Sequence, residues 1–249
     1  MIQTNRIYNE NCLEGMKKIP DGLVDAIICD LPYGTTACSW DSIIPFEAMW
    51  EQYRRVIKKD GAIVLFGAEP FSTALRNSNL SEYKYDWYWQ KNTATGFLFA
   101  KTQPMRSVET ISVFSRGTPC YFPQGIVPTK HIKPKVRHAM ETDIYRSDSL
   151  VNKEYIQEYS GYPNNVLKFE KEAKYCFHPT QKPVALLEYL IKTYTRKNEL
   201  VLDNCMGSGT TAVACVNVDR KYIGFETNKA YYEKSLQRIK ENKTQLSLF

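Results

Sequence analysis

The sequence predicts an α/β fold with a mostly parallel, twisted β-sheet and helices on both faces of that sheet. Short and almost wholly apolar runs, such as residues 24–29 and 200–203, are typical of strands that are buried on both faces. Segments with helical periodicity alternate with these runs, which is the pattern of βαβ units. The chain has 249 residues, enough for one sizeable core with an appended region.

The first half of the chain is expected to begin with a strand, a helix and a second strand. A strand over residues 24–29 leads into the tetrad Asp30–Tyr33. A helix begins after Pro45 with one apolar face, and Gly61 is expected to end it. We then expect a strand at 62–66, a short helix at 70–77 and β-rich segments at 83–89 and 109–114.

An irregular stretch separates this half from the C-terminal part. Residues 117–177 contain five prolines and no sustained periodicity. Because about 60 irregular residues are unusual inside a compact domain, we expect a functional insertion there. Regular alternation returns at Pro183, with elements expected at 183–195 (helix), 200–203 (strand), 209–217 (helix), 222–226 (strand) and 229–242 (helix).

Composition excludes several classes of protein. Hydrophobic residues make up 43% of the chain and charged residues 24%, as in soluble globular proteins. No apolar run approaches the roughly 18 residues of a membrane span, and residues 1–12 lack a signal-peptide pattern, so we expect a cytoplasmic protein without a membrane partner. The seven cysteines form no CxxC pair, so we expect reduced thiols and no metal site.

The net charge of +6 is unevenly distributed along the chain. Residues 1–80 carry 8 Lys and Arg against 10 Asp and Glu, so the positive excess lies downstream. The densest basic run comprises Lys130, Lys133, Lys135 and Arg137. Such a run is either a solvated loop or a surface that contacts successive phosphates, and the sequence alone leaves both readings open.

A glycine-rich turn after the strand at 200–203 predicts a nucleotide-like cofactor. Gly207 and Gly209 let the backbone turn sharply and approach a ligand. Glu226 ends the next strand, where its carboxylate can accept hydrogen bonds from both ribose hydroxyls of an adenosine. The lysine of a phosphate-binding P-loop is absent, which disfavours that motif.

Two features favour S-adenosylmethionine over NAD as the cofactor. A dinucleotide fold needs a second mononucleotide-binding half, but only 23 residues follow Glu226. Asp203, immediately before the turn, suits a cationic amino group better than a pyrophosphate. A glycine turn that merely packs a helix on a strand is the structural alternative.

The tetrad Asp30-Leu31-Pro32-Tyr33 lies where the first strand should end. Asp and Pro are common in ordinary turns, so the tetrad has a purely structural reading. In a catalytic reading, the Asp30 carboxylate and the Leu31 carbonyl can accept hydrogen bonds from both N–H groups of an exocyclic amine. Pro32 fixes the direction of the Leu31 carbonyl. The Tyr33 ring provides a flat face on which an extruded base could stack.

Taken together, these motifs resemble the amino-group DNA methyltransferases in the circularly permuted arrangement called the beta group. The resemblance rests on Asn9–Cys12, the tetrad at 30–33, Trp89–Asn92, Glu109, His178–Pro183, the turn at 203–211 and Glu226. The sequence departs from the family pattern at Leu31, at Asn11 and at the pair Asn204-Cys205.

The resemblance implies a Rossmann-like methyltransferase fold with residues 1–116 as the catalytic half, 117–177 as an inserted target-recognition region and 178–249 as the S-adenosylmethionine-binding half. It implies methyl transfer from S-adenosylmethionine to N6 of adenine in double-stranded DNA by base flipping. The expected catalytic residues are Asp30, Leu31, Pro32 and Tyr33. The expected cofactor residues are Asn11, Cys12, Asp30, Thr180, Lys182, Asp203, Cys205, Gly207, Ser208, Gly209, Thr210, Thr211, Glu226 and Asn228. The expected DNA contacts are Lys130, Lys133, Lys135 and Arg137.

Several alternatives stay open at this stage. Methylation of N4 of cytosine presents the same amine geometry, although Asp30 at the head of the tetrad favours adenine in resembling enzymes. The chain could instead be a non-catalytic nucleic-acid-binding module whose cofactor site is degenerate. Methyltransferases that act on RNA or on protein glutamine also share the tetrad chemistry. A homodimer and a restriction endonuclease partner are both compatible with the resemblance.

Overall fold

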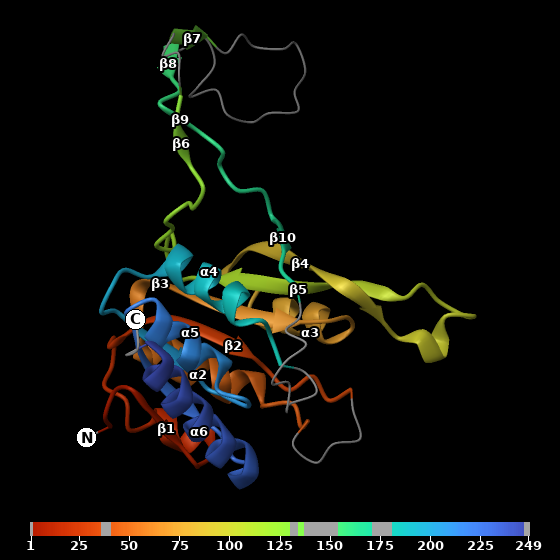
Figure 1. Cartoon of the computed structure of the whole chain (residues 1–249), viewed down its shortest axis with the longest axis vertical. Helices are drawn as coiled ribbons and strands as arrows, with labels where there is room; N and C mark the ends of the chain where they lie inside the picture. The colour runs from red at the N-terminus through yellow and green to blue at the C-terminus, as the bar shows by residue number, and fades with distance from the viewer. Residues whose placement is uncertain (1, 36–40, 130–133, 137–153, 171–180, 247–249) are drawn as a thin grey trace. The chain divides into compact units, whose positions relative to one another are not determined.

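The computed structural model describes residues 2–35, 41–129, 134–136, 154–170 and 181–246 (Figure 1). The chain divides into two compact units. The larger unit comprises Met1–Phe122 and Asn165–Phe249, and the smaller unit comprises Pro123–Asn164.

An eight-stranded sheet forms the centre of the larger unit. Its strand order in the described residues is β1-β12-β11-β2-β3-β5-β4-β10. The first five strands in this order are parallel to one another, β5 is antiparallel to both of its neighbours, and β10 pairs with β4 in parallel. The bounds are β1 Arg6–Tyr8, β12 Lys221–Phe225, β11 Leu200–Asp203, β2 Val24–Asp30, β3 Ile57–Gly67, β5 Arg106–Phe114, β4 Tyr83–Thr95 and β10 Val166–Lys168. The predicted α/β fold with a mostly parallel sheet is therefore confirmed.

Helices cover both faces of the sheet, and each face has its own core. On one face pack α1 (Cys12–Met16), α2 (Phe46–Val56) and α3 (Phe71–Ser78); on the other pack α4 (Val184–Tyr194), α5 (Thr210–Asn217) and α6 (Lys229–Leu246). Within β2, Ala26 and Ile28 belong to one core while Ile27 and Cys29 belong to the other. This double burial explains why the strand is a continuous apolar run. In the described part of the chain, no helix has the length and apolar character that crossing a membrane requires.

The prediction that Gly61 ends the first long helix is wrong. That helix ends at Val56, and Gly61 lies inside β3. A Cβ at this position would lie 2.8 Å from the Asp25 carbonyl oxygen, beside a register shift between β2 and β3. Gly61 therefore permits a close approach between two strand backbones at a bulge.

The smaller unit contains two short antiparallel strand pairs. β6 (Val127–Pro128) pairs with β9 (Tyr159–Ser160), and β7 (Pro134–Val136) pairs with β8 (Glu154–Ile156). Strands of two or three residues leave no periodicity in the sequence, which is why this stretch reads as irregular. The same property hides β1 and β10, which both join the central sheet.

Candidate active site

Three carboxylates lie at the ends of three neighbouring parallel strands. Asp30 is the last residue of β2, Asp203 is the last residue of β11, and Glu226 directly follows β12. Because these strands are adjacent, their carboxyl ends meet at one edge of the sheet, where ligands bind in open parallel sheets. A cavity of about 370 Å³ lies there and is lined by all three residues.

Most of the predicted site residues line this cavity. They are Asn11, Cys12, Asp30, Leu31, Pro32, Tyr33, Lys182, Asp203, Cys205, Gly207, Ser208, Thr210 and Glu226. Gly209, Thr211 and Asn228 are not among the lining residues, and Thr180 lies outside the described part of the chain. The cavity wall also includes Gln181, which the sequence did not single out.

Glu226 is held rigidly by the glycine turn. Its Oε2 accepts a hydrogen bond from the Gly207 N–H at 2.8 Å, and its Oε1 accepts one from the Asn228 N–H at 2.7 Å. Burial raises the pKa of this carboxyl, and the two N–H groups oppose the rise. Gly207 and Asn228 thus orient a carboxylate that borders the cavity. Asn228 does so although it does not itself line the cavity.

Gly209 has a packing function in this turn. It adopts a φ of +76°, and a Cβ there would lie 2.9 Å from the Ser235 Cβ on α6. A side chain at this position would therefore clash with the helix packed behind the turn as well as strain the backbone. Gly209 thus serves the close packing of the turn against a helix, whereas Gly207 lines the cavity.

Asp203 is buried beneath the turn and is hydrogen-bonded on both oxygens. Oδ2 accepts from the Thr211 hydroxyl at 2.5 Å, and Oδ1 accepts from the Cys205 N–H at 3.0 Å. Burial raises the pKa of Asp203 to about 6, although both hydrogen bonds favour the ionised form. Thr211 orients the carboxylate that borders the cavity, and its own contact with a cofactor stays a prediction.

Asn11 lines the cavity and caps a helix. Its Oδ1 accepts a hydrogen bond from the Leu13 N–H at 2.8 Å and so begins α1. Asn11 is one of the expected cofactor residues, and this amide oxygen is its hydrogen-bond acceptor. One of its lone pairs is used by the cap, and the residue still lines the cavity.

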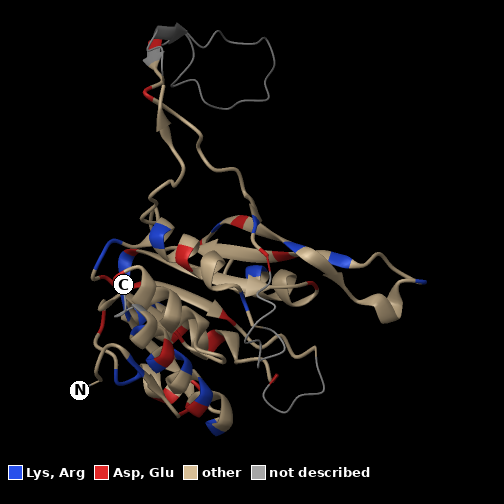
Figure 2. Cartoon of the chain, in the orientation of Figure 1, with Lys and Arg blue, Asp and Glu red and all other residues tan. Residues whose placement is uncertain are grey.

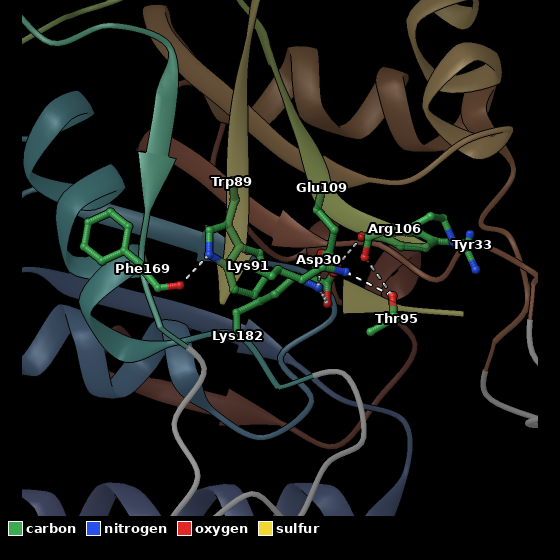
Figure 3. A network of polar contacts seen from close by, with 9 residues as sticks. All are labelled: Asp30, Tyr33, Trp89, Lys91, Thr95, Arg106, Glu109, Phe169 and Lys182. Atoms are coloured by element: carbon green, nitrogen blue, oxygen red, sulfur yellow. Dashed lines mark hydrogen bonds and ion pairs between the residues drawn. The ribbon is translucent and has the colours of Figure 1, made fainter. Parts of the chain in front are cut away.

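In the tetrad, both carboxylate oxygens of Asp30 have partners (Figure 3). Oδ1 accepts a hydrogen bond from the Tyr33 hydroxyl at 2.7 Å, and Oδ2 accepts one from Lys182 Nζ at 2.6 Å. The Tyr33 ring stacks on Phe71, with ring centroids 4.9 Å apart and an interplanar angle of 26°. These contacts hold the Asp30 carboxyl and the Tyr33 ring in fixed orientations at the cavity wall.

Behind Asp30 lies a chain of alternating buried charges that the sequence did not predict. Lys182 Nζ is 3.3 Å from Glu109 Oε2, and Glu109 Oε1 is 3.1 Å from Lys91 Nζ (Figure 3). Burial acts to lower the pKa of Lys182, but the carboxylates of Asp30 and Glu109 raise it above its ordinary value. Burial acts to raise the pKa of Glu109, and the two lysines bring it below its ordinary value. Both groups are therefore charged at neutral pH.

Gln181 provides a direct test of whether a polar ligand fits the cavity. The residue is 8% exposed, and neither its amide oxygen nor its amide nitrogen has a hydrogen-bond partner among the described residues. An orphaned buried amide is costly unless a ligand or water satisfies it. With the Glu226 and Asp203 carboxylates also lining the cavity, these acceptor groups fit a ligand that donates hydrogen bonds from hydroxyl groups and a cationic amine.

The predicted DNA contacts lie largely beyond the described residues. Lys130, Lys133 and Arg137 fall outside them, and Lys135 lies on β7 without a described side chain. Their role stays a prediction.

A family model described as DNA methylase (N6_N4_Mtase) matches residues 24–237. The chain belongs to this family. This DNA methylase is 27% identical over 249 residues to the type II methyltransferase M1.MboII of Moraxella bovis, a match that covers 93% of the chain and 95% of the relative. The solved structure of an M1.HpyAVI–SAM complex matches with a TM-score of 0.61 and 24% identity, over 94% of this chain and 98% of the other. The cytosine-N4-specific PvuII DNA methyltransferase matches with a TM-score of 0.67 and 17% identity, over 98% and 93%.

Membership of the family makes the chain an amino-group DNA methyltransferase. Adenine N6 and cytosine N4 are the two amino groups that this family description covers.

Proposed function

We propose that this DNA methylase transfers a methyl group from S-adenosylmethionine to N6 of adenine in double-stranded DNA. The observation that carries the proposal is the cavity shared by the Asp30 carboxylate and the Gly207–Glu226 turn. One end of the cavity holds groups suited to an adenosine, and the other holds acceptors suited to an amine.

The cofactor end is built from Glu226, Asp203 and Gln181. Glu226 accepts hydrogen bonds from the ribose hydroxyls, because its carboxylate is held open to the cavity by backbone N–H groups. Asp203 pairs with the amino group of the methionine part. Bound S-adenosylmethionine supplies an electrophilic methyl group on a sulfonium. The M1.HpyAVI structure, named as a complex with SAM, supports this assignment.

The amine end is built from Asp30, Leu31 and Tyr33. Asp30 accepts a hydrogen bond from one N–H of the target amine, and the Leu31 carbonyl accepts one from the other. Two acceptors on one side push the nitrogen toward a tetrahedral geometry with its lone pair directed at the methyl group. This is catalysis by positioning and charge complementarity, and the ion pair with Lys182 opposes the rise that burial causes in the pKa of Asp30.

Adenine is proposed over cytosine because Asp heads the tetrad. The structural likeness to a cytosine-N4-specific enzyme keeps N4 methylation as the alternative. The test is to incubate the protein with S-adenosylmethionine and DNA, digest the DNA to nucleosides and analyse them by mass spectrometry. N6-methyldeoxyadenosine supports the proposal, and N4-methyldeoxycytidine replaces it.

The non-catalytic alternative predicts a different result in a binding experiment. A degenerate cofactor site would leave S-adenosylmethionine unbound in isothermal titration calorimetry, whereas the proposed enzyme binds it. The relative from Moraxella bovis is named as a type II methyltransferase, so we propose a restriction endonuclease for the same sequence as partner. The insertion at 117–177 is proposed to read the DNA sequence, with its basic run on the phosphates.

A further inference from the structure

A hairpin formed by β4 and β5 extends past the edge of the central sheet. β10 pairs with β4 as far as Gln90, and β3 pairs with β5 only from Thr110 onward. Between these points, the segments of β4 and β5 within residues 91–109 pair only with each other in the described part of the chain, and the hairpin projects away from the sheet (Figure 1). A two-stranded ribbon without further packing is only marginally stable in water. The projecting part of the hairpin is therefore expected to have a function that offsets this cost.

The tip of this hairpin exposes large apolar side chains. Phe97, Leu98 and Phe99 form a 3₁₀ turn and are 79%, 92% and 56% exposed. We call these three residues the hairpin tip. Single exposed apolar residues are common in soluble proteins, whereas adjacent large apolar side chains on the surface mark a binding site.

The charges around the hairpin tip indicate an anionic partner. Residues 92–108 contain no Asp or Glu, while Lys101 and Arg106 are both exposed. Figure 2 shows basic residues along the projecting part of the hairpin. A second copy of the chain fits this surface poorly. Tip-to-tip contact would bring like charges together, and three side chains bury far less than the roughly 1,200 Å² of a stable interface.

The hairpin leaves the sheet at the same edge as the active site. β4 runs in the direction of β2 and β3, so it passes the carboxyl edge where Asp30 lies. At its root Lys91 and Glu109 join the charged chain that ends on Asp30. A duplex whose target base enters the cavity would therefore lie within reach of this hairpin.

We propose that the hairpin tip is a wedge that enters double-stranded DNA beside the extruded target base, with Lys101 and Arg106 on the adjoining phosphates. This inference rests on the proposed function. Removing a base from the stack leaves an unstacked step, and Phe and Leu side chains fill such steps in proteins that deform DNA. The wedge stabilises the extruded state without contacting the reacting atoms.

The test compares a triple variant (Phe97→Ser, Leu98→Ser, Phe99→Ser) with wild type and with a matched control, Leu80→Ser. Leu80 is 66% exposed in the turn before β4, at the far end of that strand from the tip. Two DNA probes are used. One is a duplex of about 30 base pairs that contains an unmodified site which the wild-type protein methylates, and the other is the same duplex with the target base mispaired. S-adenosylmethionine affinity and sedimentation mass are measured for each protein.

The triple variant is expected to bind the paired duplex about tenfold more weakly or worse, the scale of lost stacking, and to methylate it correspondingly slowly. The mispaired duplex should restore most of the methylation rate, because its base is already unstacked. Cofactor affinity and the Leu80→Ser protein should match wild type. Wild-type binding and rate, or an equal loss of rate on both duplexes, would overturn the wedge. A changed sedimentation mass with unchanged DNA affinity would assign the tip to self-association.

Failure of the proposed function is distinguishable from failure of the wedge. If wild-type protein transfers no methyl group to any DNA, the proposed function fails. Binding of a mixed-sequence duplex without cofactor still decides the wedge, since the triple variant must then bind more weakly than wild type and Leu80→Ser must not.

Discussion

Lys182 Nζ lies 2.6 Å from Asp30 Oδ2, so the carboxylate proposed to be catalytic is paired with an ammonium that is itself buried. Burial raises the pKa of Asp30, and Lys182 opposes that rise. Lys182 also contacts Glu109 at 3.3 Å, so it is the cation shared by two carboxylates. The proposed acceptor for the target amine therefore depends for its charge on a residue 152 positions away in the chain.

Replacing Lys182 with Met is expected to weaken both the fold and catalysis. The change leaves Asp30 and Glu109 near each other without their shared cation, which for buried pairs costs about 3–5 kcal/mol of unfolding free energy. Urea denaturation measures this loss. A second substitution, Glu109→Gln, removes one of the two charges and should restore part of the stability. If Lys182→Met unfolds at the wild-type urea concentration, the buried pair contributes no stability.

Replacing Glu226 with Ala is expected to weaken S-adenosylmethionine binding about a hundredfold or more. Two charge-assisted hydrogen bonds to the ribose are lost, each contributing about 1.5–3 kcal/mol. Isothermal titration calorimetry measures the change, and Glu226→Gln should fall between Ala and wild type because it keeps one acceptor. An unchanged dissociation constant would remove Glu226 from the cofactor site.

Cofactor affinity is expected to fall as the pH drops through about 6. Burial raises the pKa of Asp203 to about 6, so the carboxyl is ionised above that pH and neutral below it. A cationic amino group pairs with the ionised form, and each pH unit below the pKa should therefore cost about tenfold in affinity. Titration of S-adenosylmethionine between pH 5 and pH 7.5 measures this. The Asp203→Asn protein should bind weakly and without this pH dependence; a wild-type affinity that is flat over the range contradicts the assignment.

Replacing Lys130, Lys133, Lys135 and Arg137 together with Ala tests the proposed phosphate contacts. The slope of log DNA affinity against log salt should decrease in magnitude by roughly 3 to 4, at about 0.9 per phosphate. Cofactor affinity should not change, which serves as the control. If affinity and slope both match wild type, the run is a solvated loop.

The sequence predicts that the residues following the parallel strands lie together, because the carboxyl ends of parallel strands meet at one edge of the sheet. Asp30, Asp203 and Glu226 each follow a recognisable apolar run, and they meet in one cavity. The chain from Lys91 through Glu109 to Lys182 could not be placed, because it joins an antiparallel strand pair to a segment far along the chain. No local periodicity encodes such a contact.

Two glycines show a second limit of sequence reasoning. Gly61 was expected to end a helix, and Gly209 to approach a cofactor. The structure places Gly61 inside a strand, packed closely against the neighbouring strand, and packs Gly209 against α6, while the cofactor contact of Gly209 stays a prediction. A glycine indicates that a side chain is excluded, and only the fold says by which neighbour.

The central claim is that Asp30 accepts a hydrogen bond from the target amine. The most direct measurement is the rate of methyl transfer to DNA by Asp30→Ala, compared with its affinity for S-adenosylmethionine. We predict that transfer is abolished while most of the cofactor affinity remains, because Glu226 and Asp203, the residues proposed to hold the ribose and the amino group, lie on neighbouring strands. Asp30→Asn, which keeps an acceptor oxygen, should retain measurable transfer. An Asp30→Ala protein that methylates DNA at near wild-type rate would contradict the account, and the tetrad would then be an ordinary strand-end turn.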